Sequence, residues 1–486
     1  MFIGIDIGTT SVKSVLIDDD QTMVGFASAP LAVSRPRPGW SEQDPADWWQ
    51  AAAATLDTLA HDHPGPMSDV AAIGLSGQMH GATLLDASGR VLRPAILWND
   101  GRATAECAEI ESACPDARRI AGNIPMPGFT APKLLWVRRH EPGIFAATRK
   151  VLLPKDYVRL QLTGDCVSDM SDAAGTFWLD VALRRWSEAL LAATGLGLSH
   201  MPRLVEGTQP SGTLRAELAA RWGMKAPPVV AGGGGDNAAS ACGIGAVRPG
   251  SAFVSLGTSG VLFVSTARFA PNTGSAVHAF CHALPDLWHQ MGVILSATDS
   301  LNWLAGLLQV PAQELTASLG TAVTGPSPIL FLPYLSGERT PHNDAGARGV
   351  ILGIGHETDR RALVQAVLEG VAFAFRDCLR VLQEAGSDFD RAAAVGGGAR
   401  SLLWLAILAN VLDRPLDIPA AGDFGAAFGA ARLGMAAARG GDPMAVMTPP
   451  PFAQAVTPDP ALVARYAEAY GRYRALYPAI RQIRPP

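Results

Sequence analysis

The amino-acid sequence predicts an α/β protein that consists of two domains of similar build. Short apolar runs that end in glycine alternate with stretches in which apolar residues recur at helical spacing. A phrase near the start, FIGIDIGTTSVKSVLID at residues 2–18, returns as SAFVSLGTSGVLFVST at residues 251–266. With 486 residues, the chain is also longer than a single hydrophobic core usually supports. These observations favour two copies of one α/β unit.

Each copy of the phrase has the pattern of a β-hairpin, with an apolar strand, a Gly-Thr-Thr or Gly-Thr-Ser turn and a second apolar strand. The turns begin at Gly8 and Gly257, so the offset is close to half of the 486 residues. Chance similarity is the alternative, because hairpins with such turns are common. The first copy has Asp6 where the second has Ser255. Only the first hairpin therefore carries a carboxylate just before its turn.

A domain boundary is expected just before the second hairpin. The segment GIGAVRPGS at residues 243–251 has the Gly and Pro content of a connection. We therefore expect an N-terminal domain over residues 1–246 and a C-terminal domain over residues 247–486.

Helical spacing predicts helices over residues 45–60, 361–384 and 401–412. The first has a clear start, because Asp44 can cap it and Pro45 suits the first helical position.

Two glycine strings follow apolar strands, in VVAGGGGDNAAS at residues 229–240 and AAVGGGARSLLW at residues 393–404. Such strings let a backbone lie close to a ligand. The alternative is a tight strand-to-helix connection that needs positive φ angles. The first string is followed directly by a carboxylate, Asp236.

The composition points to a small-molecule partner. The net charge is −5 and no basic run or nucleic-acid-binding motif occurs, so nucleic acid is not expected.

The chain reaches Asp6 before any signal-peptide apolar region could form, which predicts a cytoplasmic protein. The uncharged stretch at residues 249–267 contains Pro249 and several Ser and Thr residues, so it is expected to be strands and a turn and not a membrane span. A homodimer remains open as the assembly.

The hairpin turns suit phosphate binding, because consecutive backbone N–H groups and hydroxyls form an anion-binding concavity. No Gly-Lys pair and no complete G-x-G-x-x-G occur, which excludes a Walker A loop and a Rossmann fingerprint. Strand alternation places Thr9, Ser11 and Lys13 on one face, so the Lys13 ammonium is expected near the same anion. The alternative is a solvated lysine at a strand end.

The paired hairpins resemble those of the actin, hexokinase and heat-shock ATPase superfamily, in which two ribonuclease-H-like domains clamp ATP in a cleft. Within it, the sequence is similar to the FGGY family of carbohydrate kinases. GFTAPKLLWVRRH at residues 128–140 fits the first family signature closely, and GVILGIGHETDRRALVQAVLE at residues 349–369 fits the second more loosely, with Ala362 at a usually polar position. Other shared motifs are GWSEQDPADWW, GQMHGATLLD, LRPAILWNDGR, LLPKDY, SDMSDAAGT and LSGERTPH. The likeness covers nearly the whole chain, with one extra glycine in GGGGDN.

The resemblance implies a role for each candidate residue. Asp236 corresponds to the family's catalytic aspartate, and Asp6 would hold Mg²⁺ through water. The implied phosphate-binding residues are Gly8, Thr9, Thr10 and Lys13 in one domain and Gly257, Thr258 and Ser259 in the other, and the implied adenosine-binding turn contains Gly397 and Gly398. The implied sugar contacts are Met79, His80 and Asn237.

The resemblance further implies ATP-dependent phosphorylation of D-xylulose at its terminal hydroxyl. Two alternatives remain: a related kinase acting on ribulose, gluconate or glycerol, and an actin-like ATPase that serves as a partner-binding module.

Structural alternatives also remain for single residues. Asp236 could be a helix N-cap, Asp6 a turn-capping residue and His80 a histidine satisfied by backbone. Asp100 and Arg102 could line the cleft or form an internal ion pair.

Overall fold

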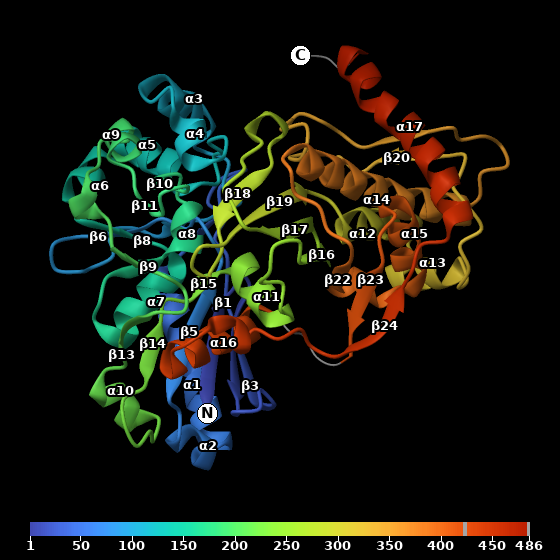
Figure 1. Ribbon diagram of the computed structural model, residues 1–486. Coiled ribbons are helices and arrows are strands. Elements are labelled where there is room, and N and C mark those ends of the chain that lie inside the picture. Colours follow the sequence, from blue (N-terminus) through green and yellow to red (C-terminus); the bar gives the residue numbers. More distant parts are fainter. Residues whose placement is uncertain (421–424, 484–486) are drawn as a thin grey trace.

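The computed structural model describes residues 1–420 and 425–483, which form two lobes (Figure 1). Within these residues, each lobe is built on a mixed sheet of seven strands. The first sheet contains β1 (Phe2–Ile7), β2 (Ser11–Ile17), β3 (Met23–Pro30), β5 (Ala72–Gly77), β13 (Pro210–Thr213), β14 (Val229–Ala231) and β15 (Gly234–Gly235). The second contains β16 (Ala252–Leu256), β17 (Gly260–Thr266), β18 (His278–Cys281), β19 (Trp288–Ile294), β22 (Ala392–Val395), β23 (Leu416–Pro419) and β24 (Phe452–Val456).

The two sheets share one strand order, β3-β2-β1-β5-β14 in the first and β19-β17-β16-β22-β23 in the second. In each, the repeated phrase forms an antiparallel hairpin, β1–β2 or β16–β17. In each, the fourth strand of this order lies parallel to the third, β5 beside β1 and β22 beside β16. The predicted duplication of a ribonuclease-H-like α/β unit is therefore confirmed.

The predicted helices form close to their expected bounds. Helix α1 (Pro45–Asp62) begins as expected, with the Asp44 side chain accepting a hydrogen bond from Ala46 N at 2.9 Å and proline in the first turn. It covers β2 and β3. Helices α14 (Arg360–Glu384) and α15 (Leu402–Leu412) pack together in the second lobe, and apolar side chains of both belong to its core.

Helix α16 (Ala426–Arg439) returns from the second half of the chain to the first sheet, where it lies across β1 and β5 and against α11 (Asp236–Ile244) (Figure 1). Two glycines permit this contact. A Cβ atom added at Gly4 would lie 1.9 Å from Ala427 O, and one added at Gly74 would lie 1.7 Å from Ala430 O. Residues 247–486 thus contribute to both lobes. The domain boundary expected at residue 246 stays a prediction.

A helical cap is inserted between β5 and β14 and contacts the second lobe near β18 (Figure 1). It contains α3 (Thr104–Ala113), α4 (Ala117–Ala121), α5 (Thr130–His140), α6 (Pro142–Ala147), α7 (Pro154–Thr163), α8 (Met170–Ala174), α9 (Glu188–Ala193), α10 (Ala216–Arg221), β6 (Thr83–Leu85), β7 (Ala95–Ile96), β8 (Lys150–Leu152), β9 (Val167–Asp169), β10 (Leu179–Asp180), β11 (Arg185–Trp186) and β12 (Arg203–Val205). The remaining elements are α2 (Pro64–Ser68), β4 (Glu42–Gln43), α12 (Thr298–Leu308), α13 (Ala312–Ser318), β20 (Leu330–Leu332), β21 (Val350–Leu352) and α17 (Pro460–Ile483).

Across the described parts of the chain, we find no helix with the length and apolarity that crossing a membrane requires.

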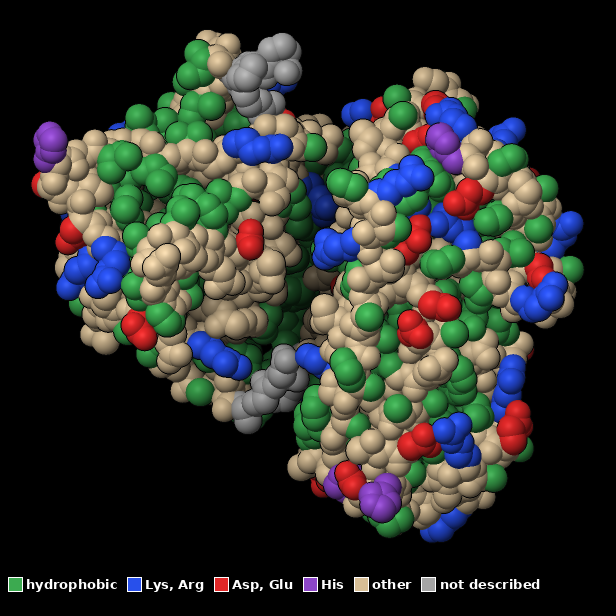
Figure 2. Space-filling model, turned by 180° about the vertical axis from the view of Figure 1, so that it is seen from behind, with side chains coloured by type: hydrophobic (Ala, Val, Ile, Leu, Met, Phe, Trp, Pro, Cys, Tyr) green, Lys and Arg blue, Asp and Glu red, His purple; other side chains and the backbone are tan. Residues whose placement is uncertain are grey.

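The molecule is hollowed between the lobes, and several Lys and Arg side chains border the hollow (Figure 2).

Candidate functional site

The first hairpin turn is held by side chains from other segments. Gly8 N donates to Ser11 O at 3.0 Å, which closes the turn. Thr9 Oγ1 donates to Gln78 Oε1 at 3.1 Å and accepts a hydrogen bond from Trp98 Nε1 at 3.0 Å. Thr10 is exposed at the tip. The turn is therefore anchored on one side and open on the other.

Gln43 and Gln78 extend this anchor to the segment after β5. Gln43 Nε2 donates to Thr9 O at 2.7 Å, and Gln78 Nε2 donates to Gln43 Oε1 at 2.8 Å. Trp48 Nε1 also donates to Gln43 Oε1, at 3.0 Å. Neither glutamine is assigned a role from the sequence alone, although SEQDP and GQMHG lie within the shared motifs. Asp6 and Lys13 are directly opposite each other in the β1–β2 ladder, so both side chains lie on one face beside the turn.

Asp236 is the first residue of α11 and directly follows β15. Gly235 occupies the N-cap position and Asp236 does not, which argues against a helix-cap role. Burial raises the pKa of the Asp236 carboxyl, while hydrogen bonds from Asn237 oppose this shift. Both Asn237 N and Asn237 Nδ2 donate to Asp236 Oδ1, at 2.7 and 2.9 Å. The carboxylate is thus oriented by its own neighbour.

The predicted sugar segment lies beside Asp236, because β15 and β5 are parallel and pair Gly235 with Gly77. A Cβ atom added at Gly235 would lie 3.0 Å from the Met79 sulfur, which shows how close the two segments are. Asn237 follows Asp236 in the first turn of α11. Met79, Asp236 and Asn237 are therefore brought together as expected.

His80 has a positive φ angle of 70° and is held by backbone contacts. Its Nδ1 lies 2.6 Å from Gly175 O, and Lys133 Nζ donates to His80 O at 2.9 Å. Because a carbonyl oxygen can only accept, Nδ1 carries the proton and Nε2 is left as an acceptor. Burial and the Lys133 charge lower the pKa of His80 to about 3, so the ring is neutral near pH 7. The backbone contact predicted by the structural alternative exists, but it uses only one ring nitrogen.

The second hairpin turn contains Gly257, Thr258 and Ser259 and is held by the start of α12. Ala297 N donates to Thr258 O at 2.8 Å, and Thr298 N donates to Gly257 O at 2.9 Å. Helix α12 therefore fixes the carbonyl groups of this turn.

The predicted adenosine turn lies at the end of β22, beside the second hairpin. Gly397 and Gly398 belong to a 3₁₀ turn (Gly397–Arg400), and a Cβ atom added at Gly398 would lie 2.8 Å from Leu256 Cβ. One added at Gly397 would have no described atom within 4 Å. Gly398 is thus tightly packed, whereas Gly397 leaves open space beside the turn.

A cavity of about 600 Å³ opens next to this turn and takes its walls from several elements. Its lining includes Ser240, Ile244, Phe253, Ser255, Val395, Gly396, Gly397, Ala399, Arg400, Ile418 and Pro419. Ser240 and Ile244 lie four and eight residues after Asp236, so all three share one face of α11. The helix that begins at the candidate base therefore leads directly to the cavity.

Asp100 and Arg102 form an internal ion pair. Arg102 Nη2 lies 2.7 Å from Asp100 Oδ2, and Arg102 Nη1 lies 2.7 Å from Glu42 Oε1. The Arg102 guanidinium also stacks over Trp40, 3.6 Å from the ring centroid. Of the two alternatives for these residues, the geometry matches the ion pair.

Comparison with known proteins shows the same family over almost the whole chain. The N-terminal domain of the FGGY family of carbohydrate kinases matches residues 1–243, and its C-terminal domain matches residues 252–438. The xylulose kinase of Escherichia coli (strain K12) is 50% identical over 481 residues, which cover 98% of each chain. The xylulose kinase of Klebsiella pneumoniae is 50% identical over 472 residues, which cover 96% of each chain. A crystal structure described as a xyloylose kinase from Brucella ovis is 58% identical, covers 99% of this chain and 100% of its own, and has a TM-score of 0.98. As its motifs and duplicated fold predict, this chain belongs to the FGGY family of carbohydrate kinases.

Proposed function

We propose that this enzyme transfers the γ-phosphoryl group of ATP to the terminal hydroxyl of D-xylulose and forms D-xylulose 5-phosphate. The substrate is proposed from the relatives that are named xylulose kinases at 50% identity over nearly their full length. The position of Asp236 supports this mechanism. Met79 lies beside Asp236, and the helix that Asp236 begins, α11, extends to the nucleotide-sized cavity.

Asp236 is proposed as the base that accepts the proton of the sugar hydroxyl. Phosphoryl transfer passes through a loose transition state, so orientation of the hydroxyl matters more than the strength of the base. The hydrogen bonds from Asn237 occupy Oδ1 and leave Oδ2 for the substrate. Burial raises the pKa of Asp236 and so makes the carboxylate a better proton acceptor.

Met79, His80 and Asn237 are proposed to bind the sugar. His80 Nε2 would accept a hydrogen bond from a hydroxyl, since Nδ1 donates to Gly175 O. Met79 supplies an apolar wall beside Asp236. The residues thus combine one apolar surface with a few placed polar groups, as sugar-sized sites commonly do.

The two hairpin turns are proposed to bind the phosphates, with Gly8, Thr9, Thr10 and Lys13 from one lobe and Gly257, Thr258 and Ser259 from the other, while Gly397 and Gly398 bind adenosine. Asp6 offers carboxylate oxygens beside the first turn, and oxygen ligands are those that Mg²⁺ prefers. Among the described residues, no group of three or more His, Cys, Asp or Glu side chains is placed to hold a metal ion. One carboxylate fits an ion that keeps most of its water, and such an ion would neutralise phosphate charge.

We also propose that the enzyme is located in the cytoplasm. Light scattering of the purified chain would distinguish a monomer from a homodimer. Closure of the hollow between the lobes is proposed to exclude water, which would otherwise compete with the sugar for the phosphoryl group (Figure 2).

The function is tested by measuring ADP release from Mg·ATP with D-xylulose, ribulose, glycerol, gluconate or no acceptor. Strong stimulation by D-xylulose alone is expected. Stimulation by another acceptor would replace the proposed substrate and retain the family. Turnover that is equal with and without every acceptor would favour the ATPase alternative.

A further inference from the structure

Helix α8 contacts both the candidate base segment and the candidate sugar segment. At its start, Ser171 Oγ accepts a hydrogen bond from Gly235 N at 3.0 Å. Directly after its end, Gly175 O lies 2.6 Å from His80 Nδ1. Because the helix has only five residues, these contacts are separated by about one helical turn. Its position therefore affects Asp236 and His80 together.

Helix α8 is fixed in turn by a buried carboxylate. Asp169 is its N-cap, with Oδ2 accepting hydrogen bonds from Ser171 N at 2.7 Å and from Ser171 Oγ at 2.5 Å. The other oxygen, Asp169 Oδ1, lies 2.8 Å from Lys155 Nζ. All three side chains are fully buried. The Ser171 hydroxyl thus donates to Asp169 while it accepts from Gly235.

Lys155 lies at the centre of a buried charge cluster. Its ammonium is 2.5 Å from Asp156 Oδ1 and 3.2 Å from Asp172 Oδ2, besides its contact with Asp169. Burial lowers the pKa of Lys155, but the three carboxylates outweigh it and keep the ammonium charged. Burial raises the pKa of Asp172 well above its usual value. Lys155 and Arg159 thus share one buried cluster with three acidic side chains, those of Asp156, Asp169 and Asp172.

Arg159 holds the other end of the glycine string. Its Nη1 donates to Ala231 O and its Nη2 to Gly232 O, each at 2.5 Å. Gly233 lies between the residues that Arg159 binds and the residue that Ser171 binds, and it has a positive φ angle of 77°. A run of glycines has little conformational preference of its own, so external contacts are needed to fix the residue that follows it. The cluster provides such contacts at both ends of the string.

We propose that Lys155, Asp169 and Ser171 form a positioning relay that sets the place of Asp236 relative to His80 and hence the alignment of the sugar hydroxyl with the phosphoryl group. The relay rests on the proposed function, because it acts through the base and the sugar histidine. It touches no substrate, so its members are positioning residues. Its three residues lie in the shared motifs LLPKDY and SDMSDAAGT.

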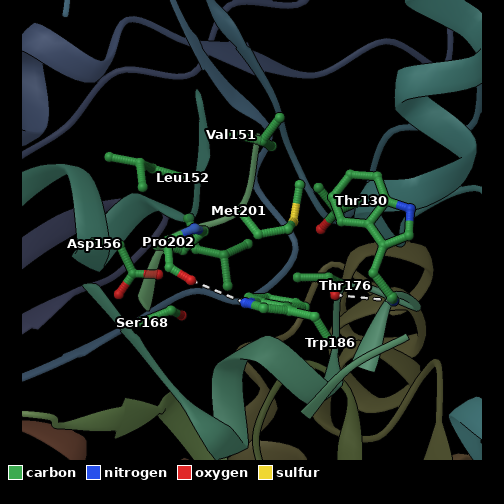
Figure 3. Close-up of a pocket in the computed structure, with 11 residues that line it drawn as sticks. Thr130, Val151, Leu152, Asp156, Ser168, Thr176, Trp186, Met201 and Pro202 are labelled. Atoms are coloured by element: carbon green, nitrogen blue, oxygen red, sulfur yellow. Dashed lines mark hydrogen bonds between the residues drawn. The ribbon is translucent and has the colours of Figure 1, made fainter. Parts of the chain in front are cut away.

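The test compares Ser171→Ala with Ser168→Ala. Ser168 is equally buried, lies on β9 three residues earlier, and its Oγ has no hydrogen-bond partner among the described residues. Figure 3 shows Ser168 and Asp156 at the wall of a small cavity. Each variant is assayed as the full chain for kcat, for both KM values, for acceptor-independent ATP hydrolysis and for its unfolding temperature.

We expect Ser171→Ala to lower kcat about tenfold or more, since a small misplacement of reacting groups is costly, while the KM for ATP stays within about twofold of the Ser168→Ala value. Acceptor-independent ATP hydrolysis should match that of Ser168→Ala, whereas the unfolding temperature should be lower, because Ser171→Ala alone removes the hydrogen bonds to Asp169 and Gly235. A kcat equal to that of Ser168→Ala would overturn the relay. So would an equal loss of kcat in both variants, because that pattern indicates general loosening of the core.

Asp169→Asn provides a second variant, because asparagine keeps the N-cap function and removes the charge opposite Lys155. It should show the same selective loss of kcat, and normal kcat in a folded Asp169→Asn protein would overturn the relay. Asp236→Asn, measured in parallel, separates the two proposals. Full activity in Asp236→Asn would contradict the role of Asp236 as the base. If Asp236→Asn is inactive and Ser171→Ala is fully active, only the relay is contradicted.

Discussion

Thr9 and Gln78 join the first hairpin turn to the segment that carries Met79 and His80. Thr9 Oγ1 donates to Gln78 Oε1 at 3.1 Å, and Gln78 Nε2 donates to Gly8 O at 3.3 Å. Since Gln78 immediately precedes Met79, one side chain connects the two parts of the site that would bind phosphate and sugar. Binding in one part can therefore influence the geometry of the other.

Gln78→Leu is expected to lower kcat/KM for both ATP and D-xylulose. Leucine has a similar size but makes none of the hydrogen bonds, and the loss of each bond costs about 1 kcal/mol, so a decrease of about tenfold or more is expected. Steady-state kinetics with each substrate varied in turn would measure it. The exposed strand residue Gln454 offers a control, and Gln454→Leu should leave both values unchanged. Normal kinetics in Gln78→Leu would show that the turn does not depend on this contact.

Asp236→Asn is expected to lower kcat by about 10²- to 10⁴-fold, which is the usual contribution of a positioned base. Asparagine preserves the size of the side chain, so the affinity for ATP should stay close to that of the wild type. Rapid-quench kinetics and calorimetric titration with ATP would give the two quantities. If the variant keeps more than about a tenth of the wild-type kcat, Asp236 does not act as a base of this strength.

His80→Ala is expected to raise the KM for D-xylulose far more than the KM for ATP. The variant removes Nε2, the ring nitrogen that the Gly175 contact leaves as an acceptor. Since burial and the Lys133 charge lower the pKa of His80 to about 3, its protonation should not affect the sugar KM between about pH 5 and 8. The exposed His61 provides the control His61→Ala. An unchanged sugar KM in His80→Ala would assign this histidine a purely structural role.

Gly397→Val is expected to raise the KM for ATP while the KM for D-xylulose stays unchanged. A Cβ atom at Gly397 meets no described atom within 4 Å, so the added side chain can enter the cavity without disturbing the fold. A matched control is Gly471→Val on α17, where an added Cβ is equally unobstructed. Nucleotide titrations and thermal unfolding of both variants would test this. An ATP KM equal to that of the control would place the nucleotide elsewhere.

Glu338→Gln is expected to change how stability depends on pH. Burial raises the pKa of Glu338 from 4.5 to about 8, against the opposing effect of hydrogen bonds from Arg339 N and Leu295 N. Between these two values the folded protein binds a proton that the unfolded chain has lost, so this group contributes less stability as the pH rises. The wild type should therefore lose stability relative to Glu338→Gln from about pH 4.5 to 8. Denaturant unfolding across this range would show it, and a constant difference would contradict the buried neutral acid.

The fold was largely predictable because its signals are local. The hairpins at residues 2–17 and 252–266 have unbroken apolar strands around Gly-Thr turns, and the structure has β1–β2 and β16–β17 there. Helix α1 begins after Asp44 as its capping pattern predicts. The path of α16 was not predictable in this way. It depends on Gly4 and Gly74 lying opposite small residues of a helix that is more than 350 positions later in the chain.

Glycines make two parts of the candidate site visible in the sequence. The string before Asp236 and the turn with Gly396 and Gly398 contain glycines because the backbone there lies close to other groups. Gln43 and Ser171 were not assigned, since an isolated polar residue gives no sign of its partner. Their roles arise from contacts with Gln78, Thr9 and Gly235 that only the folded chain creates.

We propose above that Asp236 directs a phosphoryl group from ATP onto the terminal hydroxyl of D-xylulose. This role is tested by ³¹P and ¹³C NMR of the products formed from Mg·ATP and D-xylulose by the wild type and by Asp236→Asn. The wild type is expected to form a phosphate monoester at C5 together with ADP, and the variant is expected to form almost none. Inorganic phosphate without sugar phosphate, a phosphate on another carbon, or equal product from both proteins would contradict it.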